Sequence, residues 1–118
     1  MQFRRKTLIA SLVLLWSVEA SAQTTPATPA REFVSNYCVT CHGINADGNG
    51  RAARLYNPRP ANLRISDKND AYFALIIRMG GEAMGRSQFM PPWGEELTDE
   101  QTNDLVTYLR SINARPKE

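Results

Sequence analysis

The chain has few cysteine and histidine residues. Its 118 residues include two cysteines, Cys38 and Cys41, and a single histidine, His42. A structural zinc site needs a second pair of Cys or His ligands, which this sequence does not have. A thioredoxin-like redox pair is also disfavoured, because the alternating strands and helices of that fold are not found after Cys41. A disulfide across the two intervening residues would close a small, strained loop. The two cysteines therefore point to another kind of chemistry.

The N-terminal apolar stretch is too short to cross a bilayer as a helix. It covers residues 8–18, which is 11 residues, whereas a membrane-spanning helix needs about 20. Three basic residues at positions 4–6 precede it, and the small-x-small sequence at 20–22 follows it. This order is typical of a secretion signal. We therefore predict a cleavable signal peptide at residues 1–22 and a periplasmic location, with an uncleaved membrane anchor as the alternative.

The rest of the chain has no excess charge of either sign. The signal accounts for three of the 14 basic residues and one of the 12 acidic residues, which leaves 11 of each. No basic stripe remains, so nucleic acid is not an expected partner. Residues 23–30 contain two prolines and no apolar period, and we predict a flexible lead-in there. Residues 31–114 then suit one small domain, followed by a short tail at 115–118.

The sequence Cys38-Val39-Thr40-Cys41-His42 is the most informative motif in the chain. Two cysteines with this spacing, followed at once by histidine, are typical of a c-type haem attachment site. The thiols of Cys38 and Cys41 can form thioethers with the two vinyl groups of a haem. The imidazole of His42 can then bind the iron as its proximal ligand. We predict one covalently bound haem c, which also agrees with export to an oxidising compartment.

Apolar periodicity predicts two helices in the first part of the domain. The first runs from about Arg31 to Tyr37, with Phe33 and Tyr37 on one face, and leads directly into Cys38. The second begins after a cap at Ser66 or Asp67 and ends at Gly80-Gly81, where glycine favours a left-handed backbone. Its expected buried stripe consists of Tyr72, Leu75, Ile76 and Met79.

The third predicted helix has the clearest start signal. Thr98 is followed three residues later by Gln101, which matches a capping box. No stretch of the sequence shows the alternation that a strand requires. We therefore expect an all-α domain of three main helices, with loops wrapped around one covalently attached haem. The buried stripe of the third helix is expected to be Leu105, Tyr108, Leu109 and Ile112, backed by Val106.

A methionine is the expected second axial ligand, because the chain has no other histidine. Met79 lies on the apolar stripe of the second helix and is expected to fill the core. Met84 lies in a glycine-flanked loop, and Met90 precedes Pro91-Pro92-Trp93. The spacing alone does not separate Met84 from Met90. The stiffness that proline gives to its loop favours Met90.

Together these motifs resemble a class I monohaem cytochrome c of the bacterial, periplasmic type. The resemblance covers residues 33–112 and includes the order Cys-x-x-Cys-His, Met-Pro-Pro-Trp and a capped last helix. It implies that Cys38 and Cys41 form the thioethers, that His42 is the proximal ligand and that Met90 is the distal ligand.

The resemblance has two further structural implications. The segment Pro60-Ala61-Asn62-Leu63 resembles the loop in which a proline carbonyl orients the proximal imidazole, so Pro60 and Leu63 are expected to contact the haem. Pro58 and Pro60 are both candidates for that carbonyl. The first and last helices are expected to cross, with Phe33 or Tyr37 against Tyr108.

The expected function is single-electron transfer, and no enzymatic activity is expected. His/Met ligation raises the reduction potential, and burial of the porphyrin would raise it further. Expected partners are a periplasmic dehydrogenase, an oxidase or a respiratory complex, docking near the Cys38–Cys41 edge, with membrane contact only through that partner. The alternative is a haem enzyme or gas sensor with an open or labile sixth position, in which Arg86 or Gln88 would be the polar distal group. The residues expected to bury the porphyrin are Leu55, Leu63, Leu75, Ile76, Leu97, Leu105 and Leu109.

Overall fold

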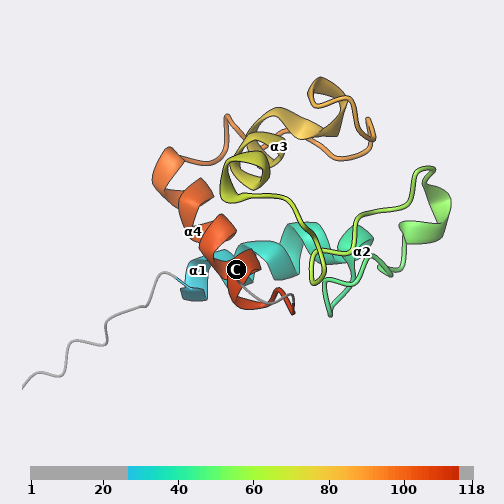
Figure 1. Cartoon of the computed structure of the whole chain (residues 1–118), viewed down its shortest axis with the longest axis horizontal. Coiled ribbons are helices and arrows are strands. Elements are labelled where there is room, and N and C mark those ends of the chain that lie inside the picture. Colours follow the sequence, from blue (N-terminus) through green and yellow to red (C-terminus); the bar gives the residue numbers. More distant parts are fainter. Residues whose placement is uncertain (1–26, 115–118) are drawn as a thin grey trace, which may run out of the picture.

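A computed structural model describes residues 27–114, and every regular element in this range is helical (Figure 1). The expected all-α fold with three main helical segments is therefore confirmed. No helix between residues 27 and 114 is long and apolar enough to span a membrane. The predicted signal peptide lies outside the described residues.

The first helical segment carries the Cys-x-x-Cys-His motif. It consists of α1 (Ala27–Phe33), a π-helical turn η1 (Val34–Cys38) and α2 (Val39–His42). The helix begins at Ala27, not at Arg31, so the last part of the predicted lead-in is helical. Pro29 is tolerated there because the first turn of a helix has no partners for its N–H groups. Ala30 is buried in the core, and this burial favours the longer helix.

The second helical segment is α3 (Asp70–Ala83). The side chain of Asn69 caps it by accepting a hydrogen bond of 2.9 Å from the backbone N–H of Tyr72. The predicted caps at Ser66 and Asp67 are therefore wrong, because the helix begins one residue after Asn69. The predicted end at Gly80-Gly81 is close to a kink in α3, since Gly80 has a non-helical φ of 76°.

The buried face of α3 differs from the predicted stripe. Phe73 and Ile77 are buried in the core, whereas Leu75 and Met79 are 46% and 51% exposed. The expected core position of Met79 is therefore wrong. Tyr72 and Ile76 are half-buried and line a cavity beside the core. The helix thus presents one face to the core and a neighbouring face to the cavity.

The last helix, α4 (Asp99–Ser111), begins at the predicted capping box. The Thr98 hydroxyl accepts a hydrogen bond of 3.1 Å from Gln101 N, and Gln101 Oε1 accepts one of 2.9 Å from Thr98 N. α4 packs against both α1 and α3, so the expected crossing of the first and last helices is confirmed (Figure 1). The core lies where these three helices meet. It consists of Ala30, Val34, Phe73, Ile77, Leu97, Leu105, Val106 and Leu109.

Candidate functional site

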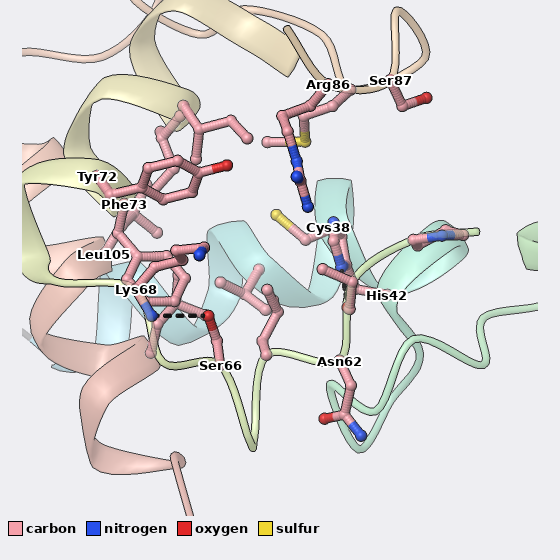
Figure 2. Close-up of a pocket in the computed structure, with 18 of the residues that line it drawn as sticks. Cys38, His42, Asn62, Ser66, Lys68, Tyr72, Phe73, Arg86, Ser87 and Leu105 are labelled. Atoms are coloured by element: carbon pink, nitrogen blue, oxygen red, sulfur yellow. Dashed lines mark hydrogen bonds between the residues drawn. The ribbon is translucent and has the colours of Figure 1, made fainter. Parts of the chain in front are cut away.

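A cavity of about 420 Å³ lies beside the core. Its walls come from the first helical segment, the loop at residues 58–68, α3, the loop before α4, and α4 itself (Figure 2). This volume is typical of a pocket that binds an organic ligand or cofactor. The apolar part of the wall consists mainly of Phe33, Val34, Leu63, Phe73, Ile76, Ile77, Leu105 and Leu109.

The two cysteines lie where this cavity adjoins a smaller one. Cys38 lines the large cavity and also a smaller adjoining one, and Cys41 lines the smaller one. Both thiols are free. Burial raises the pKa of the Cys38 thiol to about 11, and the neighbouring Cys41 contributes to this increase. The helical turn therefore places both cysteines at the border of the smaller cavity.

His42 is the last residue of α2 and lines both cavities. Its Nδ1 lies 2.9 Å from the carbonyl oxygen of Ala61. A carbonyl only accepts, so Nδ1 carries the proton and Nε2 is left with a free lone pair for a metal. Burial lowers the pKa of the imidazole, and the bond to Ala61 opposes this effect in part. A neutral, oriented imidazole of this kind suits an iron ligand.

The carbonyl that orients His42 belongs to Ala61, so the expectation that Pro58 or Pro60 supplies it is wrong. Pro60 restricts the backbone just before Ala61, and it lines the cavity together with Pro58 and Leu63. The proline therefore contributes to the shape of the segment, and the carbonyl that faces the ring follows it by one residue.

The loop after His42 holds the Ala61 segment in place. Gly48 N donates to the His42 carbonyl at 2.8 Å, and Leu63 N donates to the Ala46 carbonyl at 2.8 Å. A Cβ on Gly48 would lie 2.6 Å from the Pro60 oxygen, so the close approach of the two segments requires glycine at this position.

Met90 is the methionine that lines the cavity with His42. It is half-buried and borders both cavities. Among the other described methionines, Met84 lines neither cavity and Met79 is mostly exposed. The structure thus brings together the predicted site residues Cys38, Cys41, His42, Pro60, Leu63 and Met90.

Three of the leucines expected around the porphyrin do not line the cavity. Leu55 is 78% exposed, on the 3-10 turn η2 (Ala53–Leu55), and Leu75 is also exposed. Leu97 is buried in the core instead. Apolar character alone did not distinguish these leucines from those that line the cavity, because their distance from it depends on the tertiary fold.

Trp93 is a cavity residue that sequence reasoning did not single out. The centroid of its ring lies 5.1 Å from that of Phe33, in an edge-on arrangement, and 5.2 Å from that of Tyr37. Trp93 also lines both cavities. The expected ring contact of Phe33 or Tyr37 with Tyr108 is therefore replaced by a contact with Trp93. The available signal was the position of Trp93 directly after Pro91-Pro92, which places it in the same segment as Met90.

These residues fit a c-type haem. Two thiols, one oriented imidazole and one thioether border a largely apolar cavity, which is the donor set and environment that such a group requires. Fold and site therefore define a monohaem cytochrome c domain. Residues 25–109 match the family described as cytochrome c oxidase, cbb3-type, subunit III, and the chain belongs to this family. Membership indicates haem-based electron transfer with respiratory redox partners. Among curated proteins, none has a significant sequence match to this chain.

Proposed function

We propose that the protein is a periplasmic electron carrier that binds one haem c through Cys38 and Cys41, with His42 and Met90 as the axial ligands. One observation carries this proposal: Cys38, Cys41, His42 and Met90 all border the same smaller cavity, so two thiols, an imidazole and a thioether lie around one space. The export signal expected at residues 1–22 supports a periplasmic location.

The residues around the cavity have distinct functions in this proposal. When bound, the haem supplies an iron that accepts and releases one electron. The Ala61 carbonyl holds His42 in the tautomer that leaves Nε2 free for the iron. The thioether of Met90 favours the ferrous state. The apolar wall formed by Leu63, Ile76 and Leu105 disfavours the additional charge of the ferric state.

Electrons would enter and leave at the edge of the haem held by Cys38 and Cys41. Tyr37 and Phe89 border the smaller cavity at this edge, and both are about half exposed. Two half-exposed aromatic side chains at this edge suit a small, short-lived contact with a redox partner. Family membership supports a respiratory oxidase or another respiratory complex as that partner.

Substitution of Met90 tests the ligand assignment. Met90→Ala should keep the haem covalently attached, because the thioethers do not involve this residue, but should lower its reduction potential and allow carbon monoxide to bind the ferrous iron. Met84→Ala is the matched control, since Met84 lies outside both cavities, and it should change neither property. An unchanged potential and spectrum in Met90→Ala would refute the assignment.

A haem enzyme or gas sensor is the second candidate function. It is favoured by one observation, which is that the side chain of Arg86 extends into the cavity toward Cys38 and His42 (Figure 2). A polar distal group of this kind can stabilise a bound gas. This function requires a sixth position that is open or easily vacated, so binding of carbon monoxide by the unmodified protein would favour it.

A further inference from the structure

The segment that carries Met90 lies directly against the C-terminal part of α3. Gly81 N donates to the Met90 carbonyl at 2.9 Å, and Trp93 N donates to the Ile77 carbonyl at 2.9 Å. Arg86 N donates to the Gly81 carbonyl at 2.7 Å. Backbone hydrogen bonds therefore fix the segment before Met90, at Met90 itself and after it. We call these three bonds the α3 contact of Met90.

Two consecutive glycines make this approach sterically feasible. A Cβ on Gly80 would lie 2.9 Å from both the Met90 carbonyl oxygen and Pro92 N. A Cβ on Gly81 would lie 2.1 Å from the Ser87 carbonyl oxygen and 3.0 Å from Met90 Cβ. The clashing atoms are mostly backbone, so they cannot move aside as a flexible side chain can. A side chain at either position would have to displace the segment that carries Met90.

We propose that Gly80 and Gly81 are positioning residues that hold the Met90 thioether over the haem iron. This inference rests on the proposed function, in which Met90 is the distal ligand. The two glycines never contact the iron. They set the distance between α3 and the Met90 backbone, and that distance determines where the thioether of Met90 lies.

Gly80 could also be required only because its φ of 76° is unfavourable for other residues. Gly85 separates these two explanations. Its φ is also positive, at 65°, but a Cβ on Gly85 would have no neighbour within 4 Å. Gly85→Ala therefore introduces similar backbone strain without the clash. Gly81 gives the complementary case, because it is not among the glycines with positive φ, so alanine there introduces the clash without that strain.

The test uses the haem-loaded protein and four variants: Gly80→Ala, Gly81→Ala, Gly85→Ala and Met90→Ala. Two properties are measured, the weak far-red absorption band of a thioether bonded to ferric haem and the binding of carbon monoxide to the ferrous form. We expect Gly80→Ala and Gly81→Ala to lose the band and bind the gas, as Met90→Ala does, with covalent haem content and helical ellipticity unchanged. Gly85→Ala should keep the band and exclude the gas.

Each other outcome contradicts one part of the inference: the ligand assignment, the positioning by the glycines or the steric explanation. If Met90→Ala loses the band while Gly80→Ala and Gly81→Ala keep it, Met90 is the ligand but the glycines do not position it. If Met90→Ala keeps the band, the proposed ligand is wrong, and the inference is overturned with it. If Gly85→Ala loses the band as readily as Gly80→Ala, backbone strain and not the clash is responsible, which also overturns the inference.

Hydrogen exchange on the unmodified haem protein decides the matter if neither Gly80→Ala nor Gly81→Ala folds. As denaturant is added, the amides of Gly81 and Trp93 should lose their protection together with the far-red band. The reason is that the α3 contact of Met90 both protects these amides and positions the thioether. Protection that persists after the band has disappeared would overturn the inference.

Discussion

Truncation of Leu105 to alanine should destabilise the haem-loaded protein by about 3 kcal/mol. Leu105 is 3% exposed, belongs to the core and also lines the cavity. The substitution removes three buried carbon atoms, for which the lost transfer free energy is about 2.4 kcal/mol at roughly 0.8 kcal/mol each. The remaining void adds to this value, which places the total within the range of about 2–5 kcal/mol typical of buried leucines.

The free energy of unfolding is measured by guanidinium titration of the haem-loaded protein, followed by helical ellipticity. Leu55→Ala is the matched control, because it removes the same atoms from a residue that is 78% exposed and lies outside both cavities. Its effect should stay within about 0.5 kcal/mol, as is usual for surface substitutions. A loss at Leu55 as large as the loss at Leu105 would refute this reasoning, since it would mean that Leu55 covers the haem.

Two further predictions concern the N-terminus of α4 and the loop after His42. Thr98→Ala should lower the free energy of unfolding by about 1 kcal/mol, because it removes the acceptor for Gln101 N; Thr98→Ser should retain most of the stability, and equal losses in both variants would contradict the capping explanation. The hydrogen bond from Asn49 N lowers the pKa of Asp47 below its ordinary value of 3.8. The resulting stabilisation is present above this value and is lost as the pH falls through the lower pKa of the folded state. Titration of the Asp47 carboxyl by NMR checks this prediction, and a pKa above 3.8 would contradict it.

Two features that can be read from the sequence depend only on residues close together in the chain. The capping box of α4 involves Thr98 and Gln101, which are three residues apart, and the structure contains both of its hydrogen bonds. The Cys-x-x-Cys-His motif is likewise complete within five consecutive residues. Local chemistry of this kind can be read without knowledge of the tertiary fold.

The features that the sequence missed depend on contacts between distant segments. His42 pairs with Ala61, 19 residues away, and the choice among neighbouring carbonyls depends on how the loop turns. The buried stripe of α3 was misassigned because this helix faces both the core and the cavity, so its apolar face is wider than a single stripe. The local sequence at Gly80-Gly81 predicts only a helix end, since nothing in it indicates that the Met90 segment lies against these glycines.

The most direct test of the proposed function is the absorption spectrum of the reduced, exported protein before and after addition of carbon monoxide. We expect a sharp, low-spin haem c spectrum that the gas does not change, because His42 and Met90 would occupy both axial positions of the iron. A spectrum that shifts when the gas is added would contradict closed His/Met ligation and favour the sensor or enzyme function.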